Sequence, residues 1–234
     1  MSRLPLALRL ALRELRGGLG GFRVFLACLA LGVLAVAAIG SVRMSITAGL
    51  EAEGRAILGG DAQITTTYRD ATEAERAWME ANAERVSTIA DFRSMAVAGS
   101  GAEVRRTLTQ VKAVDGAYPL AGSVALSPEM ALSDALAGRD GLPGAVVEPA
   151  LAERLALAPG DRLRIGGVEF VVTARLAREP DRASGGFGFG PRSLVSRAAL
   201  EGTGLLGPGT LYEMHHRLDL PEGADPDALS DALA

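Results

Sequence analysis

The chain has 234 residues, with 24 basic against 28 acidic side chains and a formal net charge of −4. Residues 1–42 hold five arginines against one glutamate, so the rest of the chain carries a net charge of −8. An acidic body of this kind argues against a nucleic-acid partner. With Cys28 as the single cysteine, the chain has no internal disulfide, and no Cys/His spacing indicates a zinc site.

The first 21 residues read as a basic head. Residues 3–16 place leucines at helical spacing among arginines, which predicts an amphipathic helix on the inner face of a membrane, with a disordered tail as the alternative. The glycine-rich run 17–21 is expected to break this helix before the next one begins. Residues 1–21 are therefore predicted to be a cytoplasmic basic amphipathic segment.

The longest uncharged run, Val24–Val42, lies between Arg23 and Arg43. As a helix it would be roughly 28 Å long, close to the hydrocarbon thickness of a bilayer. A buried core helix and a cleaved signal peptide are the alternatives; the first would show a polar face, and the second a shorter apolar run. We predict one membrane helix, anchored by the following apolar residues: Val24, Phe25, Leu26, Leu29, Leu31, Leu34 and Ile39.

The arginines set the predicted orientation. They are more numerous before the apolar run than just after it, so the positive-inside rule places the N-terminus in the cytoplasm. The predicted location is the bacterial inner (plasma) membrane, with the residues after about 43 in the periplasm. The basic head also suits an anionic inner leaflet.

Helical spacing continues through Met44–Leu58, and Gly59-Gly60 is expected to end it. Residues 22–58 are thus predicted to be a transmembrane helix and stalk, and residues 59–234 an outer domain. Thr72-Glu73-Ala74-Glu75 has the capping-box pattern, and Gly166-Gly167 suits a two-residue hairpin turn. Further helices are expected at 72–83, 131–137, 149–157 and 225–234. Strands are expected at 61–67, 86–98, 103–115, 161–176, 192–199 and 211–220.

These elements define an α+β fold class: a single N-terminal transmembrane helix, then a mixed α/β periplasmic domain. Residues 61–115 and the end of the chain are expected to build one lobe. Residues 144–191 are expected to build a small β-rich lobe.

The sequence offers little catalytic chemistry. It contains no G-x-S-x-G nucleophile elbow and no G-x-x-x-x-G-K-[ST] phosphate loop. His215 and His216 are adjacent in an expected strand and would point to opposite faces, so they cannot share one metal ion. We therefore predict no catalytic, cofactor or metal residues, and a membrane-anchored hydrolase ranks last among the candidate functions.

Two neighbouring segments leave alternatives open. Gly185–Pro191 could be an outer loop that offers Phe187 and Phe189 to a partner or lipid, or a loop folded over the core of the domain. Glu179–Arg182 could be a solvated turn with a weak ion pair, or a fixed corner that positions that loop.

Four segments together resemble a known family. Leu176–Pro191, LAREPDRASGGFGFGP, and Val111–Leu120, VKAVDGAYPL, resemble signatures of the YbbP-type group of FtsX-like ABC-transporter permeases. Val147–Gly166 resembles the periplasmic core domain of MacB-like permeases, and Leu8–Arg16 resembles the segment before their first membrane helix. The candidate partner-contact residues that the first signature implies are Arg178, Glu179, Pro180, Asp181, Arg182, Ser184, Gly185, Phe187, Phe189 and Pro191.

The resemblance implies a non-catalytic permease subunit without a cofactor, paired with a separate ABC ATPase. Such a subunit couples ATP hydrolysis to periplasmic work or to export of a lipid, lipoprotein or peptide. The implied partners are the ATPase, the remainder of the permease or a second copy, membrane lipid and a periplasmic protein. Family members carry more membrane helices, so this chain is expected to be the N-terminal portion. The alternative function is a single-span, membrane-anchored periplasmic binding or scaffold protein.

Overall fold

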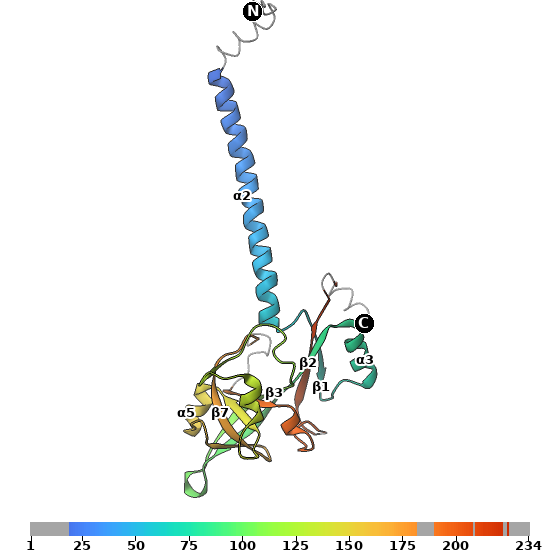
Figure 1. Cartoon of the computed structure of the whole chain (residues 1–234), viewed down its shortest axis with the longest axis vertical. Helices are drawn as coiled ribbons and strands as arrows, with labels where there is room; N and C mark the ends of the chain where they lie inside the picture. Colours follow the sequence, from blue (N-terminus) through green and yellow to red (C-terminus); the bar gives the residue numbers. More distant parts are fainter. Residues whose placement is uncertain (1–18, 182–189, 208, 222–223, 225–234) are drawn as a thin grey trace, which may run out of the picture. The chain divides into compact units, whose positions relative to one another are not determined.

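The computed structural model describes residues 19–181, 190–207, 209–221 and 224 (Figure 1). The chain divides into two compact units, residues 1–52 and 53–234. The helices expected at 3–16 and 225–234 and the segment 182–189 lie outside the described residues.

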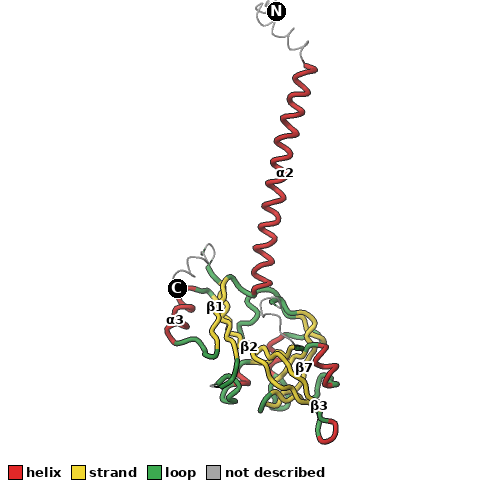
Figure 2. The backbone as a smooth tube through the Cα atoms, turned by 180° about the vertical axis from the view of Figure 1, so that it is seen from behind, coloured by secondary structure: helices red, strands yellow, loops and turns green. Residues whose placement is uncertain are grey.

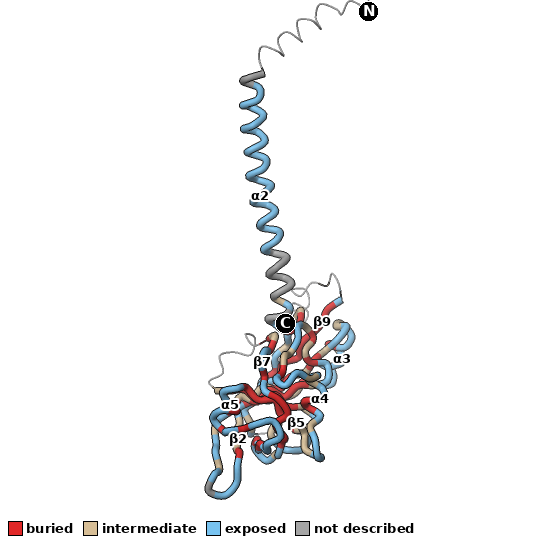
Figure 3. The backbone as a smooth tube through the Cα atoms, turned by 60° about the vertical axis from the view of Figure 1, so that its left-hand side comes forward, coloured by how far each residue is buried: buried red, intermediate tan, exposed pale blue. Residues whose placement is uncertain are grey.

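A single helix, α2 (Leu19–Leu58), runs for 40 residues and contains a candidate membrane span at Phe22–Ile46. None of that span is buried against other parts of the protein (Figure 3). The seven predicted anchor residues are exposed, from 45 % for Leu26 to 72 % for Ile39. The described residues do not bury this segment as a core helix, and its apolar surface is of the kind that lipid covers.

The predicted glycine break is wrong at Leu19, Gly20 and Gly21, because α2 already includes them. Glycine costs about 1 kcal/mol in a helix relative to alanine, a cost that does not interrupt so long a helix. The predicted end is confirmed. Gly59 has φ +77°, and the amides of Gly59 and Gly60 donate to the Arg55 carbonyl at 2.8 and 3.1 Å.

The described strands of the globular unit, yellow in Figure 2, form one mixed nine-stranded sheet. The order is β1-β9-β2-β3-β8-β5-β7-β4, with β6 pairing both β2 and β7. Their bounds are β1 (Ala62–Thr67), β2 (Arg85–Ala98), β3 (Arg105–Val114), β4 (Ala125–Ser127), β5 (Gly144–Val147), β6 (Arg162–Ile165), β7 (Val168–Arg178), β8 (Arg192–Ser196) and β9 (Tyr212–Asp219). Both predicted hairpins, β2–β3 and β6–β7, are present and antiparallel.

Six of these strands close on themselves. The pairings run β2-β3-β8-β5-β7-β6 and return to β2 through Ala96–Ala98 and Leu163–Ile165. Alternate residues point inward and form the main core, where small side chains such as Ala90, Ala113 and Ala145 suit a narrow barrel. The strands assigned to the two expected lobes are thus hydrogen-bonded into one sheet.

Short helices cover parts of this sheet. They are α3 (Glu73–Asn82), α4 (Leu132–Ala137) and α5 (Pro149–Leu155), with 3₁₀ turns at Gly101–Glu103 and Ala198–Leu200. The predicted capping box of α3 is confirmed, and Met79 is its buried residue. Residues of α5 join the barrel core, and residues of α4 join a second core on the outer side of the barrel. The α+β fold class predicted from the sequence is confirmed.

Candidate functional site

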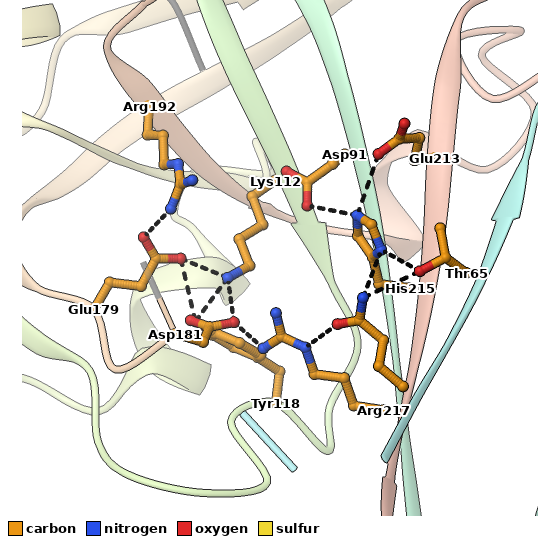
Figure 4. Close-up of polar contacts among 11 residues, drawn as sticks. Thr65, Asp91, Lys112, Tyr118, Glu179, Asp181, Arg192, Glu213, His215 and Arg217 are labelled. Atoms are coloured by element: carbon orange, nitrogen blue, oxygen red, sulfur yellow. Dashed lines mark hydrogen bonds and ion pairs between the residues drawn. The ribbon is translucent and has the colours of Figure 1, made fainter. Parts of the chain in front are cut away.

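Six buried polar side chains from distant parts of the chain form one network (Figure 4), which we call the buried charge cluster. Its members are Lys112 on β3, Tyr118 in the following loop, Glu179 and Asp181 just after β7, Arg192 at the start of β8, and Arg217 on β9. The two sequence signatures, Val111–Leu120 and Leu176–Pro191, therefore meet in space.

Lys112 lies at the centre of the cluster. Its Nζ donates to Glu179 Oε1 at 2.6 Å, to Asp181 Oδ2 at 2.7 Å and to the Tyr118 hydroxyl at 3.1 Å. The ammonium group has three protons, so these acceptors use its full donor capacity. The Tyr118 hydroxyl donates in turn to Asp181 Oδ1 at 2.7 Å.

Each carboxylate also pairs with an arginine. Arg192 Nη1 lies 2.7 Å from Glu179 Oε2, and Arg217 forms an ion pair with Asp181. The carboxylate side chains are 1 % and 0 % exposed. The solvated-turn interpretation is therefore wrong for Glu179 and Asp181, whereas Arg178 is exposed and takes no part in the cluster.

Burial and pairing act on the pKa values in opposite directions. Burial lowers the pKa of Lys112 from 10.5 to about 8, although Glu179 opposes that shift. Burial alone would raise the pKa of Glu179, but Lys112 and Arg192 outweigh burial and hold it below 4.5. Burial also raises the pKa of Tyr118, so its hydroxyl remains a donor. At neutral pH the lysine and Glu179 are both charged.

The cluster fixes the chain on both sides of residues 182–189. Glu179 precedes that segment and Arg192 follows it, and the two are ion-paired. The Pro191 carbonyl accepts from Thr109 Oγ1 at 2.8 Å and from the Gln110 amide at 3.1 Å. This geometry agrees with a fixed corner at both ends. Of the candidate contact residues, Arg182, Ser184, Gly185, Phe187 and Phe189 lie outside the described part of the chain.

The cluster also contacts the residues that end α2. A Cβ atom on Gly59 would overlap the Arg217 guanidinium and lie 3.1 Å from Asp181 Cβ. In the last turn of α2, Arg55 Nε lies 2.6 Å from Asp61 Oδ1, and its Nη2 lies 2.5 Å from Asp219 Oδ1. We call Arg55, Gly59, Asp61 and Asp219 the helix root.

A second row of polar side chains continues from Arg217 along β9. Arg217 Nε donates to Gln63 Oε1 at 3.3 Å, and Gln63 lies 3.3 Å from His215 Nδ1. His215 Nε2 is 3.6 Å from Asp91 Oδ2, whose pKa is raised by burial. His216 instead faces Thr88, at 3.2 Å, so the two histidines point apart as strand alternation predicts. Across the described residues, no group of three or more His, Cys, Asp or Glu is placed to hold a metal ion.

The buried charge cluster is suited to a structural role. Its donors and acceptors bind one another and hold four strand ends and the helix root together. Lys112, Tyr118, Arg192 and Arg217 were not among the residues predicted for the site. One signal for Lys112 was available, since it is the single lysine in an arginine-rich chain and lies within a signature. Arg192 and Arg217 reach the cluster only through strand pairing.

Comparison with known proteins identifies the family of this domain. The chain belongs to the MacB-like periplasmic core domain family, whose model matches residues 24–234. It is 29 % identical over 186 residues to the uncharacterized ABC transporter permease YbbP of Escherichia coli (strain K12), a match that covers 78 % of this chain. The chain spans only about a fifth of that relative, 21 % of its length.

Solved structures of low identity are also similar. The extracellular domain of the noncanonic ABC-type transporter YknZ from Gram-positive bacteria matches with a TM-score of 0.43 at 15 % identity, covering 69 % of this chain and 77 % of that one. The periplasmic region of MacB from Actinobacillus actinomycetemcomitans matches with a TM-score of 0.44 at 10 % identity, covering 76 % and 83 %.

Replacing Glu179 with glutamine should destabilise the domain. The change leaves Lys112 and Arg192 buried without that counter-charge, which costs about 3 kcal/mol or more. Urea unfolding of the full chain in detergent micelles, followed by the fluorescence of the single tryptophan, Trp78, measures the effect. The control is Glu169→Gln at an exposed pair with Arg162, where less than about 1 kcal/mol is expected. Equal losses for the two variants would contradict the assignment.

The single lysine should titrate far below its usual range. In protein labelled with [ε-¹³C]lysine, the one lysine signal should have its midpoint near pH 8 rather than 10.5. Because the folded-state pKa is the lower one, the unfolded chain holds this proton more tightly between those values. Lys112 alone therefore makes the unfolding free energy rise with pH across that window. A midpoint at 10 or above would contradict the conclusion that burial outweighs ion pairing at Lys112.

Alanine at Gly59 should cost more than alanine at Gly141. The two glycines have almost the same φ, +77° and +78°, so both substitutions carry a left-handed backbone cost of about 1–2 kcal/mol. Only Gly59 has the Arg217 guanidinium in the way, whereas nothing lies within 4 Å of a Cβ on Gly141. The same unfolding assay should show at least about 1 kcal/mol of further loss for Gly59→Ala. A loss no larger than that of Gly141→Ala would argue against the close contact.

Proposed function

We propose that this chain supplies the first membrane helix and the periplasmic core domain of an ABC-transporter permease. Family membership supports the proposal, as does the match to a permease. The apolar helix Phe22–Ile46 is long enough to cross a bilayer. In this proposal ATP hydrolysis takes place on a separate ATPase subunit, and the remainder of the permease or a second copy completes the membrane part.

The proposed orientation places the arginine-rich N-terminus in the cytoplasm and the residues after about 43 in the periplasm. The support is the charge asymmetry, five arginines against one glutamate before residue 43. The domain boundaries 1–21, 22–58 and 59–234 belong to the same proposal.

In this proposal, motion of α2 reaches the domain through the helix root. The observation that carries it is the pair of contacts made by Arg55, one to Asp61 before β1 and one to Asp219 at the end of β9. Asp219 also binds Arg85 at 2.5 Å on β2, so three strands respond to the position of one helical turn. Arg55 is 53 % exposed, so each pair alone is weak, and the linkage rests on their convergence.

The proposed work is force transmission to a periplasmic partner or export of a lipid, lipoprotein or peptide. Force transmission fits a domain whose buried charges bind one another across four strands. The proposal that Phe187 and Phe189 contact a partner or membrane lipid is supported by the fixed corner at Glu179 and Arg192, which holds both ends of their segment.

Inserting Gly-Gly between Ala52 and Glu53 of the complete permease tests the coupling. The insertion should abolish the stimulation of the partner ATPase by the permease in reconstituted nanodiscs, because two extra residues rotate the membrane span by about 200° about the helix axis relative to Arg55. The matched control inserts Gly-Gly between Gly202 and Thr203, in an exposed turn, and should keep stimulation near the wild-type level. Full stimulation with the insertion after Ala52 would refute force transmission through this helix. A complete permease that binds no ATPase would instead favour the single-span scaffold.

A further inference from the structure

The outward face of the β2–β3 hairpin changes in character along its length. At Asp91 and Lys112, which are paired in the register, the face is charged; Lys112 is buried and the Asp91 side chain is 10 % exposed. The next pairs on the same face, two residues further each time, are Arg93 with Gln110, Met95 with Leu108, and Val97 with Arg106. The exposed pairs of the hairpin therefore lie between the buried charge cluster and the β2–β3 turn, which projects from the domain in Figure 1.

Strand β6 adds a further cation to this face. Val97 pairs with Arg106 of β3 on one side and with Arg164 of β6 on the other. Directly paired residues point to the same face, and two strand spacings put the two arginine Cα atoms roughly 10 Å apart. Val97, Arg106 and Arg164 also line a groove of about 700 Å³, whose other charged lining residues are Arg105, Arg162, Glu103, Asp161 and Glu169.

This surface is open and unpaired in the described part of the chain. Arg93, Arg106 and Arg164 are exposed, and none of them forms an ion pair with another described residue. Glu169 lies opposite Arg164, but its two carboxylate oxygens take Arg162, at 3.3 and 3.2 Å.

Between the arginines lie Met95 and Leu108, 49 % and 44 % exposed. We call Arg93, Met95, Arg106, Leu108 and Arg164 the hairpin face. It is a cationic and apolar surface, although residues 43–234 together carry a net charge of −8.

We propose that the hairpin face docks an acidic segment of a partner protein. Carboxylates of that segment bind the guanidinium groups of Arg106 and Arg164, and its apolar side chains cover Met95 and Leu108. The argument is charge complementarity together with composition. Guanidinium groups bind carboxylates in bidentate geometry, and arginine and methionine are enriched in protein interfaces.

A membrane surface fits this face less well. Recognition of anionic lipid by a basic surface usually takes a cluster of about four to eight lysines and arginines, and the hairpin face has three arginines around an apolar centre. The face is also small, since four residues along a strand span roughly 14 Å. An interface of this size is of the weak, transient class, and we expect a Kd in the micromolar range.

A pair of synthetic peptides tests the proposal directly. The full chain is held in nanodiscs of neutral phosphatidylcholine and titrated with a fluorescein-labelled (Leu-Glu)₄ peptide and its (Leu-Lys)₄ counterpart, with fluorescence anisotropy as the readout. The acidic peptide should bind and the basic one should not. The double variant Arg106→Glu/Arg164→Glu should weaken binding at least tenfold, and raising the salt concentration should weaken it as well. Arg139→Glu, at an exposed arginine outside the face, should leave the Kd unchanged.

Three results would overturn the proposal. The first is equal binding of both peptides, and the second is binding that the double charge reversal does not change. The third is co-sedimentation of the nanodisc-held chain with phosphatidylglycerol vesicles, lost in the double variant, while the acidic peptide does not bind. Circular dichroism and the urea midpoint establish that both variants fold. This test does not involve the helix root. A negative result would therefore leave the proposed coupling through α2 unaffected.

Discussion

The structure depends on one constraint: a lysine that is 3 % exposed must be matched by buried counter-charges and hydrogen-bond acceptors. Lys112 meets this constraint with Glu179 and Asp181, which in turn require Arg192 and Arg217. Buried ion pairs often add little net stability over apolar packing, but removing one partner is costly. We therefore interpret the cluster as a device that admits one arrangement of β3, β7, β8 and β9 and penalises others.

The buried charge cluster is connected to two other parts of the domain. Arg217 packs against Gly59, which follows the last turn of α2, where Arg55 is paired with Asp61 and Asp219. Along β2 and β3 the face that carries Asp91 and Lys112 becomes the exposed hairpin face. Direct contacts thus join the last turn of α2 to the buried charge cluster, and β2 and β3 continue from that cluster to the hairpin face.

Local signals in the sequence were enough to predict the local structure. Thr72 and Glu75 predicted the start of α3, Gly166-Gly167 predicted the β6–β7 hairpin, and Gly59 predicted the end of α2, because each depends on neighbouring residues alone. The ring of strands could not be predicted in this way. The pairing of β6 with β2 and the parallel pairing of β3 with β8 join segments far apart in the chain. Arg217 was missed for that reason, since it looks like any alternating strand residue.

The most direct test of the central claim is amide hydrogen exchange on the full chain with Lys112→Met. If Lys112 holds the network together, exchange should accelerate not only on β3 but also at Asp61 and Leu220, whose amides donate to the Leu218 carbonyl and to the Asp61 carboxylate. The amides of Ala145 and Val146 on β5, whose side chains lie in the barrel core and in the second core, should stay protected, which would exclude global unfolding. Acceleration confined to β3, with Asp61 and Leu220 unchanged, would contradict the account.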